Sequence, residues 1–438
     1  MSREMKNSGV DWIGEIPAKW DVVPFRSYAE MRREKNKGVK TRELLALSFA
    51  LGVTLYRDKV FNMDRVKDDY EDYQLVYEND LVLSPNDIIK GSVYVSKYYG
   101  CISPMYLVFS ARDAETYHLP YLSYLLRTQE AGRKFFFIAR GLIGDILDNG
   151  KYVTRRMSVS KQDLMSFKVL LPSVSEQRKI VSFLNRKCSE IDEMIALQEK
   201  VIDELKTYKQ SVITEAVTKG LNPDVPMKDS GIEWIGEIPE HWSIDKIIRS
   251  FGLIGSGTTP KSTDEDNFNG NIRWIQSGDI NGGVMTECKN RISEKTLHTT
   301  SALKIYNPPF IIIAMYGASV GNTSISMIDG CVNQACCVLS ESHLNLEYSF
   351  NVIKSCKDFW IRKAVGGGQP NISQDTIKST WIPIPPKEEQ KQIASYLNTK
   401  CTEIDNLISI KLSKIDSLKE YKKSIIYEYV TGKKEVTE

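Results

Sequence analysis

The most regular hydrophobic pattern in the chain covers residues 176–220, where apolar positions follow one another in alternating steps of four and three. This spacing places the side chains on one stripe of an α-helix and is typical of a coiled-coil seam. The segment therefore predicts a single helix about 65 Å long, at 1.5 Å per residue. The seam positions are Leu184, Cys188, Ile191, Ile195, Gln198, Ile202, Leu205, Lys209, Val212 and Ala216.

The same pattern returns at residues 389–433, where residue 390 corresponds to residue 177 and about half of the positions are identical. Polar residues interrupt both seams at equivalent places, which fixes the register at some cost in stability. Helices this long do not fit inside one compact domain. We expect the two to pack against each other, antiparallel; the alternative is two surface helices on separate domains. The second seam is Leu397, Cys401, Ile404, Ile408, Lys411, Ile415, Leu418, Lys422, Ile425 and Tyr429.

Residues 21–170 contain short runs rich in β-branched and aromatic residues and bounded by turn formers, which predict strands. A single helix is expected over residues 119–137, with Pro120 in a first turn that tolerates it. The pattern is that of a mixed α+β domain. The expected strands are 44–49, 80–84, 92–100 and 105–110.

Residues 243–383 repeat this domain: Gly91 aligns with Gly321, and a helix over 346–363 corresponds to the one over 119–137. The loops between such anchors have diverged, and loops are where binding specificity usually resides. The predicted fold class is α+β, with two similar mixed α/β domains separated by two long antiparallel coiled-coil helices, an internal pseudo-two-fold repeat. The expected boundaries are 1–172 for the first domain, 173–220 for the first helix, 221–385 for the second domain and 386–438 for the second helix.

The composition limits the partners, the cellular location and the metal sites that we expect. The 438 residues carry a net charge of only +2, so a polyanionic partner would have to meet local patches. No apolar run is long enough to span a membrane, and the N-terminus lacks the apolar core of a signal peptide. We therefore expect a cytoplasmic protein that does not bind a membrane. Eight cysteines occur without a CxxC pair, which argues against a zinc site and favours small core residues.

One motif invites a catalytic interpretation. Asn307, Pro308, Pro309 and Phe310 match the NPP(F/Y/W) motif of adenine-N6 methyltransferases. The apolar strand lies after this motif instead of before it, however, and no acidic residue follows residues 251–258 to hold a ribose. A turn into a core strand is the preferred interpretation. We expect no catalytic residue and no metal ligand in the chain.

Several motifs carry a family resemblance. WIGEIP begins each domain, YGASVGN (316–322) is followed by GCVNQA (330–335), and the signature around EQ starts each long helix. Together they resemble the specificity subunits of type I restriction–modification systems, over essentially the whole chain. The resemblance implies a non-catalytic subunit with two target recognition domains, each reading half of a bipartite site in double-stranded DNA. The implied partners are two methyltransferase subunits and translocase–nuclease subunits, which would hold S-adenosylmethionine, ATP and Mg²⁺.

Candidate DNA contacts in the second domain are polar loop residues, because Gln and Asn pair with adenine edges while Ser and Tyr take phosphates or bases. Each of them could instead simply stabilise a turn. Glycine at 367 would let the backbone approach the duplex closely. The candidates are Gln276, Ser277, Asp279, Tyr316, Ser319, Gln334, Gly367, Gln369 and Asn371.

In the first domain, the loop 86–90 replaces YGASV and residues 141–152 replace the glycine-rich segment, so contacts there are less defined by the resemblance. A basic run from Arg32 to Arg42 either joins the DNA surface or is a solvated loop. Polar and basic side chains supply the candidates: Ser48, Asn86, Lys90, Lys134, Arg140, Lys151, Arg155 and Arg156.

The long helices carry the partner hypothesis. Apolar residues beside the seam could bind a second protein or thicken the intramolecular seam: Phe183, Val201, Ile213 and Val217. Three functions remain in competition: a DNA-reading specificity subunit, which is preferred; a stand-alone adenine methyltransferase using Asn307 and Phe310; and a coiled-coil scaffold without a nucleic-acid role.

Overall fold

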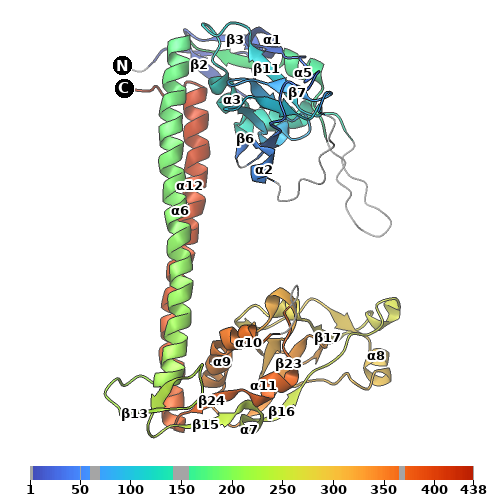
Figure 1. Ribbon diagram of the computed structural model, residues 1–438, viewed down its shortest axis with the longest axis vertical. Coiled ribbons are helices and arrows are strands. Elements are labelled where there is room, and N and C mark those ends of the chain that lie inside the picture. The colour runs from blue at the N-terminus through green and yellow to red at the C-terminus, as the bar shows by residue number, and fades with distance from the viewer. Residues whose placement is uncertain (1–2, 50, 60–69, 142–156, 365–369, 438) are drawn as a thin grey trace. The chain divides into compact units, whose positions relative to one another are not determined.

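The computed structural model describes residues 3–49, 51–59, 70–141, 157–364 and 370–437. The chain forms two compact units, one of residues 1–199 with 412–438 and one of residues 200–411. Each unit contains a mixed α/β domain and part of both long helices, α6 (Val174–Lys219) and α12 (Lys387–Val430), as Figure 1 shows. The predicted α+β class and the two long helices are confirmed.

The main sheet of the first unit has four antiparallel strands in the order β4-β11-β8-β9. Leu81 and Leu83 point to one face and pack with α3 and α4, while Val82 points to the other face, which the β5–β6 hairpin covers. Both faces of this sheet are therefore buried. The strands are β1 (Met5–Asn7), β2 (Glu15–Pro17), β3 (Asp21–Pro24), β4 (Ala29–Met31), β5 (Leu45–Ser48), β6 (Gly52–Leu55), β7 (Gln74–Val76), β8 (Leu81–Leu83), β9 (Val93–Val95), β10 (Gly100–Ile102), β11 (Leu107–Ala111) and β12 (Lys168–Leu171), with the helices α1 (Phe25–Tyr28), α2 (Tyr56–Lys59), η2 (Ile88–Lys90), α3 (Leu119–Leu126), α4 (Gln129–Ile138) and α5 (Lys161–Ser166).

The second unit has a five-stranded sheet in the order β16-β23-β20-β21-β18. Ile311 and Ile313 face a core shared with α9, while Ile312 faces a second core with Tyr306 and Val338. Beside it, β17 pairs in parallel with β22 and antiparallel with β19. The strands are β13 (Met227–Asp229), β14 (Glu237–Pro239), β15 (Ser243–Lys246), β16 (Phe251–Gly255), β17 (Ile272–Ile275), β18 (Val284–Met285), β19 (Arg291–Ile292), β20 (Phe310–Ala314), β21 (Thr323–Ser326), β22 (Cys331–Val332), β23 (Cys336–Ser342) and β24 (Trp381–Ile384), with the helices α7 (Ile247–Ser250), η3 (Glu265–Asn267), η4 (Ser277–Asp279), α8 (Glu294–Thr299), η5 (Gly317–Ser319), α9 (Leu346–Ser355), α10 (Lys357–Lys363) and α11 (Gln374–Ser379).

The single helices expected over 119–137 and 346–363 are wrong, because each is broken in two. Thr128 separates α3 from α4 and caps α4, its hydroxyl accepting a hydrogen bond from the amide of Ala131 at 3.3 Å. In the second domain the break between α9 and α10 falls at Cys356. The apolar pattern runs through the breaks because the two helices of each pair bury their side chains in the same core.

The predicted seam is confirmed within each unit, since none of its positions is fully exposed. In the first unit the Lys422 ammonium donates to both carboxylate oxygens of Asp192 at 2.6 Å. In the second unit Lys209 donates to both oxygens of Asp405, at 2.6 and 2.7 Å. These bridges occupy equivalent positions of the repeat, so the same pair fixes the antiparallel register twice.

The paired Glu and Gln that begin each long helix have the same contacts in both units. The indole of Trp20 donates to Glu176 and that of Trp242 to Glu389, each at 2.9 Å. The next residue, Gln177, is fully buried; its amide donates to the carbonyl of Pro172 at 2.8 Å, and its oxygen accepts from the amide N–H of His118 at 2.9 Å. Gln390 does the same with Pro385 and Asn345. The EQ signature thus joins a strand end, a helix start and a tryptophan.

We expect Gln177→Met to lower the free energy of unfolding by about 2–4 kcal/mol, because it leaves the backbone groups of Thr116, Pro172 and His118 without their side-chain partner. Urea denaturation of the full chain measures the effect. Gln392→Met, at an exposed position of α12, should change stability by less than about 0.5 kcal/mol. Equal effects of the two substitutions would contradict this role.

Within the described ranges, no helix is both long and apolar enough to cross a bilayer. The same residues contain no cluster of His, Cys, Asp and Glu suited to a metal ion. Cys101 and Cys331 occupy equivalent buried positions, and burial raises the pKa of both thiols to about 11. These cysteines are core residues, as their apolar surroundings in the sequence predicted.

Candidate nucleic-acid interface

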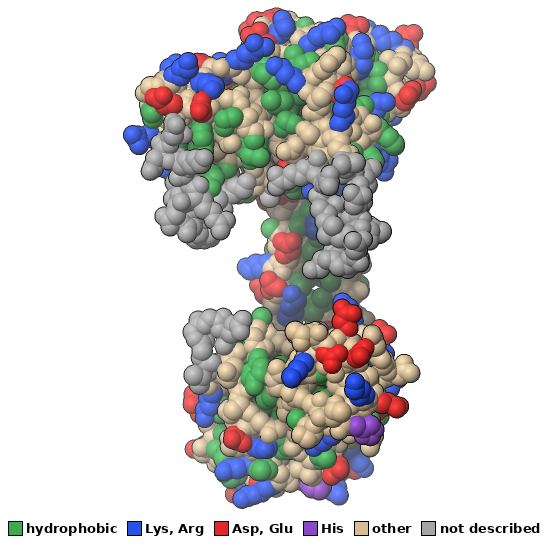
Figure 2. Space-filling view, turned by 90° about the vertical axis from the view of Figure 1, so that its right-hand side faces the viewer, with side chains coloured by type: hydrophobic (Ala, Val, Ile, Leu, Met, Phe, Trp, Pro, Cys, Tyr) green, Lys and Arg blue, Asp and Glu red, His purple; other side chains and the backbone are tan. Residues whose placement is uncertain are grey.

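Charge is mixed on the face of each domain that Figure 2 presents. Figure 2 shows Lys and Arg side chains interspersed with Asp and Glu on each of them. A nucleic-acid surface therefore has to be sought in local groups of side chains, as the net charge of +2 required.

In the second domain, two parallel strands bring predicted residues together. Ile275 of β17 pairs with Val332 of β22, so the residues after them lie side by side. The amide of Asn333 donates to the carbonyl of Ile275 at 3.0 Å, which places Gln276 next to the loop carrying Gln334. Both glutamines are at least partly exposed. Two segments nearly 60 residues apart in sequence thus form one polar edge.

The four predicted residues on this edge have different local roles. The Asp279 carboxylate accepts from the backbone amide of Gln276 at 2.9 Å, and the backbone amide of Asp279 donates to the Gln276 carbonyl at 2.9 Å, so both residues hold η4 in place around Ser277. The Gln334 oxygen instead accepts from the hydroxyl of Thr259 at 2.5 Å. This bond orients the Gln334 amide and leaves its NH₂ group free to donate to a base acceptor.

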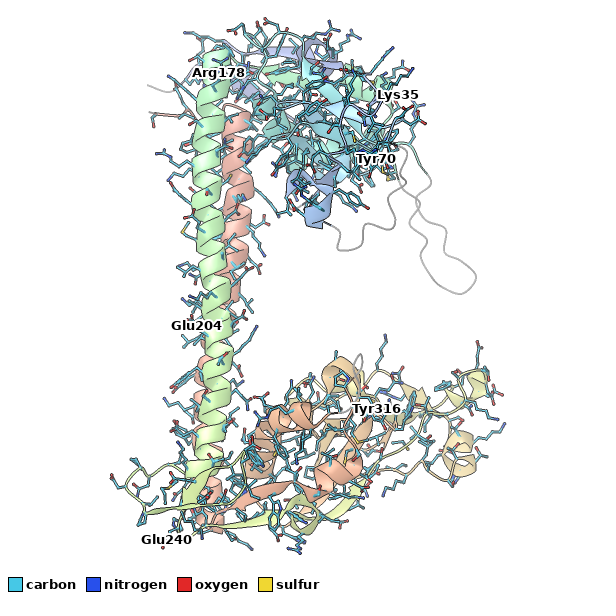
Figure 3. All side chains as sticks on the ribbon, in the orientation of Figure 1. Lys35, Tyr70, Arg178, Glu204, Glu240 and Tyr316 are labelled. Carbon is cyan, nitrogen blue, oxygen red and sulfur yellow. The ribbon has the colours of Figure 1, made fainter. Side chains whose placement is uncertain are left out.

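A second pair of predicted segments also meets in this domain. Tyr316 forms a β-bridge with Asn371, and the amide of Gly317 donates to the carbonyl of Pro370 at 3.0 Å. Tyr316 lies at the surface of the second domain (Figure 3), with 42% of its area exposed. The Ser319 hydroxyl donates to the carbonyl of Tyr316 at 3.2 Å and closes the turn. Gly367 and Gln369 lie outside the described residues.

A pocket of about 800 Å³ beside Gln276 contains residues that sequence reasoning missed. Lys289, Asn290 and Arg291 line it together with Thr259, and no carboxylate is among its lining residues. In the sequence, two basic residues flanking an asparagine at 289–291 were the only signal that could have indicated this pocket. The pocket provides hydrogen-bond donors and positive charge, which suits base edges and phosphates.

The predicted residues of the first domain are more scattered. Ser48 caps the β5–β6 turn, accepting from the amide of Leu51 at 3.3 Å, and Arg140 approaches Asp163 at 3.8 Å. Asn86 and Lys134 are half-buried, while Lys90 is exposed. Lys151, Arg155 and Arg156 lie outside the described residues.

Three of the six cations in the basic run before β5 are paired with carboxylates. Arg32 forms a bidentate pair with Asp80 at 2.7 and 2.9 Å, and the Lys40 ammonium lies 2.7 Å from Glu34. Lys35 likewise pairs with Asp72. This arrangement favours a structural role for these three cations over phosphate binding.

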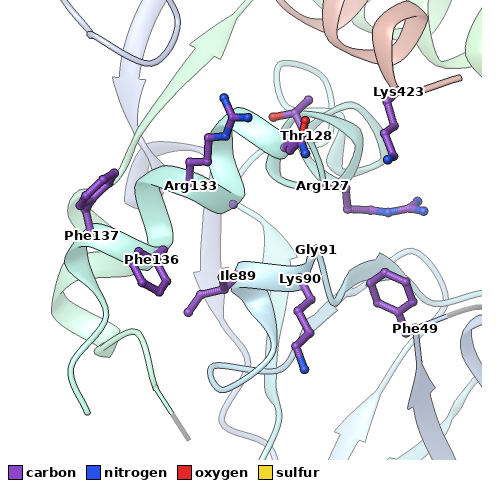
Figure 4. Close-up of a pocket in the computed structure, with 12 residues that line it drawn as sticks. Phe49, Ile89, Lys90, Gly91, Arg127, Thr128, Arg133, Phe136, Phe137 and Lys423 are labelled. Atoms are coloured by element: carbon purple, nitrogen blue, oxygen red, sulfur yellow. The ribbon is translucent and has the colours of Figure 1, made fainter. Parts of the chain in front are cut away.

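A first-domain pocket of about 580 Å³ gathers Lys90 with side chains not predicted from the sequence (Figure 4). It lies between η2, α4, the turn after β5 and α12 of the same unit. Three of its aromatic rings are exposed: Phe49 by 64%, Phe136 by 44% and Phe137 by 80%. Among the residues that the structure describes, the pocket is lined by the basic side chains of Lys90, Arg127, Arg133 and Lys423 and by no carboxylate.

Two of the residues predicted to bind a partner protein are core residues. Ile213 and Val217 are 1% and 0% exposed, packed in the core of the second unit with Trp242 and Tyr348. The structure contradicts their assignment to a partner surface. Phe183 is half-buried against Tyr429, with ring centroids 4.4 Å apart, and Val201 is half-buried on α6.

Six exposed apolar residues of the helices form a different set and occupy equivalent positions of the repeat, whereas the exposed Tyr396 and Leu412 have no such counterpart. The first unit exposes Met194 and Leu197 on α6 and Tyr421 on α12; the second unit exposes their counterparts at Leu407, Ile410 and Tyr208. Their exposed fractions range from 42% to 63%. Each unit therefore carries one copy of the same surface, which we call the helix patch.

The helix patch faces away from the domain of its own unit. Met194 and Leu407 follow the bridged Asp192 and Asp405 by two residues, about 200° around an α-helix. The domains pack on the bridged edge: burial and the Lys209 ammonium lower the pKa of Lys354 in α9. In the first unit the Tyr124 hydroxyl of α3 donates to Asn185 at 2.8 Å. The helix patches are open surfaces.

Comparisons with known proteins agree on one group. Residues 239–420 match the family described as the type I restriction modification DNA specificity domain. A sequence of Methanocaldococcus jannaschii assigned as the type I restriction enzyme MjaX specificity subunit is 25% identical, with 96% of this chain and 95% of that one aligned. The MjaVIII specificity subunit of the same organism is 24% identical over 95% and 93%.

Solved structures share the fold along the chain. A chain from a study of complex assembly in the type I R-M system superposes with a TM-score of 0.69 at 16% identity, covering 95% of this chain and 98% of that one. The HsdS subunit of Thermoanaerobacter tengcongensis gives a TM-score of 0.50 at 17% identity over the same shares.

Proposed function

We propose that this chain, which belongs to the family of specificity subunits of type I restriction–modification systems, reads a bipartite DNA site with its two domains. DNA recognition is the role shared by that family. The observation that supports one half-site per domain is the internal repeat: the same fold occurs twice in the chain, and the two copies expose different side chains. The second domain presents the oriented amide of Gln334 beside Gln276, while the first presents a basic and aromatic pocket. Two unlike surfaces on one repeated fold suit two different half-sites.

We further propose that the helix patches bind two copies of a methyltransferase subunit. Each unit exposes an equivalent group of three large apolar side chains, and exposed apolar groups of this kind mark protein contacts. A repeated patch fits two copies of one partner better than two different partners. Translocase–nuclease subunits would join the same complex, which we place in the cytoplasm with the DNA.

The chemistry is proposed to reside in those partners, which would hold S-adenosylmethionine, ATP and Mg²⁺. The structure offers a specific argument against the stand-alone methyltransferase. Asn307 to Pro309 form the turn before β20, and the ring of Phe310 is 0% exposed in the core beside Tyr306. A buried ring cannot stack on a flipped adenine, so this motif serves folding.

Methyl transfer with labelled S-adenosylmethionine and duplex DNA tests the proposal. We expect incorporation only when the full chain and its methyltransferase subunit are both present. Incorporation by the purified chain alone would support the stand-alone enzyme instead. A specificity role also requires binding that weakens steeply with salt, because phosphate contacts release counterions.

A further inference from the structure

The first-domain pocket combines features that ordinary duplex contacts do not require. Phe137 is 80% exposed at the end of α4, beside Phe136, with ring centroids 5.9 Å apart. Large apolar side chains grouped at a surface usually have a binding role. Phosphate contacts alone would need only the surrounding cations.

The two rings stand on a rigid base. Phe135, the residue before them, is fully buried and stacks on Phe167 with centroids 4.3 Å apart. Gly132 brings α4 so close to η2 that a Cβ at this position would lie 2.6 Å from the carbonyl oxygen of Ile89. The backbone that carries Phe136 and Phe137 is therefore fixed in place before any ligand arrives.

The charges around the rings select a polyanion. Lys90, Arg127 and Arg133 form no ion pair with any carboxylate that the structure describes, and only Lys423 has one, with Glu420 at 2.6 Å. The Arg127 guanidinium is held 4.1 Å from the centre of the Tyr94 ring. Protein–protein interfaces are depleted in Lys, whereas nucleic-acid surfaces are rich in Lys and Arg. The charge of the pocket thus favours DNA over a protein partner.

We propose that Phe136 and Phe137 form a wedge that enters one base step of the first half-site and unstacks it, while Lys90, Arg127 and Arg133 hold the flanking phosphates. Apolar wedges of this kind partially unstack and kink a duplex in other DNA-binding proteins. Readout by the first domain then depends on how easily the step deforms as well as on base edges. The proposal rests on the proposed function, since the first domain has to bind duplex DNA.

The described part of the second domain has no pair of adjacent exposed aromatic rings at the end of α10. This helix buries Trp360, and the residues after it are Ile361, an aliphatic side chain that is 44% exposed, and Arg362. The wedge therefore distinguishes the two half-sites, and unstacking is expected in the first half-site alone.

Unstacking is measured with 2-aminopurine placed singly along both half-sites, away from the methylated adenines. The full chain is bound with its methyltransferase subunit in the absence of S-adenosylmethionine. We expect fluorescence to rise at one step of the first half-site, and an abasic residue at that step to tighten binding about tenfold. In a Phe136→Ala/Phe137→Ala variant the rise should disappear and the abasic gain should fall to less than about threefold. Ile248→Ala removes an apolar side chain of the second domain whose exposed fraction, 50%, lies between those of Phe136 and Phe137, and it should behave as wild type.

The outcomes separate the two proposals. If the wild-type complex shows no salt-dependent binding to duplex DNA, the proposed function is wrong. The wedge proposal is wrong if the complex binds DNA but 2-aminopurine fluorescence rises at no position of the first half-site. It is also wrong if the double variant gives the same rise as wild type. If the double variant loses its methyltransferase subunit in size-exclusion chromatography, the rings are a protein contact and the wedge is likewise wrong.

Discussion

Aspartate at both Leu407 and Ile410 is expected to reduce the number of bound methyltransferase subunits from two to one. The two side chains are 46% and 63% exposed and form most of the helix patch of the second unit. Placing two carboxylates in an apolar contact should weaken that copy by at least about 100-fold, as expected for hot-spot residues. Native mass spectrometry of the reconstituted complex counts the subunits directly.

The repeat supplies a matched counterpart, because Met194→Asp with Leu197→Asp should remove the other copy. Combining all four substitutions should leave the chain without methyltransferase subunits and abolish methylation. Ser395→Asp with Thr402→Asp adds the same charge to exposed positions of α12 toward the bridged edge, and should leave two copies bound. Two copies at wild-type affinity in the Leu407/Ile410 variant would show that the partner binds elsewhere.

Gln334→Glu is expected to weaken binding of the cognate duplex by about tenfold to a hundredfold, the range of one good base contact. The Thr259 hydroxyl already donates to the Gln334 oxygen, so the base would meet the NH₂ group. Glutamate removes that donor and sets a negative charge against the base acceptor. Fluorescence anisotropy of the complex on labelled duplexes measures the change.

The loss should depend on the second half-site. Duplexes with a scrambled second half-site should bind the wild-type and Gln334→Glu complexes about equally, while scrambling the first half-site should leave the difference intact. Gln392→Glu on α12 adds the same charge at an exposed glutamine and should have little effect. A loss that persists on the scrambled second half-site would identify a general electrostatic effect instead of base reading.

The long helices were the part of the fold most open to prediction. A seam of ten positions that is repeated at a constant offset defines which side chains of the two helices face each other. Both Lys–Asp bridges use a lysine of this seam. The helices of the domains were harder. The break at Thr128 lies inside a continuous apolar pattern, because α3 and α4 bury residues in one core. Local periodicity does not record a change of helix axis.

The candidate site also contains residues that the sequence predicted and residues that it did not. Tyr316 and Asn371 were predicted as polar residues in separate loops, and the backbone bridge between them explains how they meet. The wedge residues were missed because Phe136 and Phe137 follow the buried Phe135, so that all three look like core. Ile213 and Val217 were misassigned for the opposite reason: helix phase alone did not reveal that the second domain covers them. Burial depends on tertiary packing, which a single sequence carries only indirectly.

The central claim is that each domain reads its own half of one DNA site. The most direct measurement exchanges residues 243–383 for the corresponding domain of a family member with another specificity, followed by long-read mapping of methylated adenines in cells carrying the chimaera and its methyltransferase. In this experiment we expect one half of the methylated sequence to change and the other half to stay. Methylation in which both halves change, or neither does, would contradict the central claim.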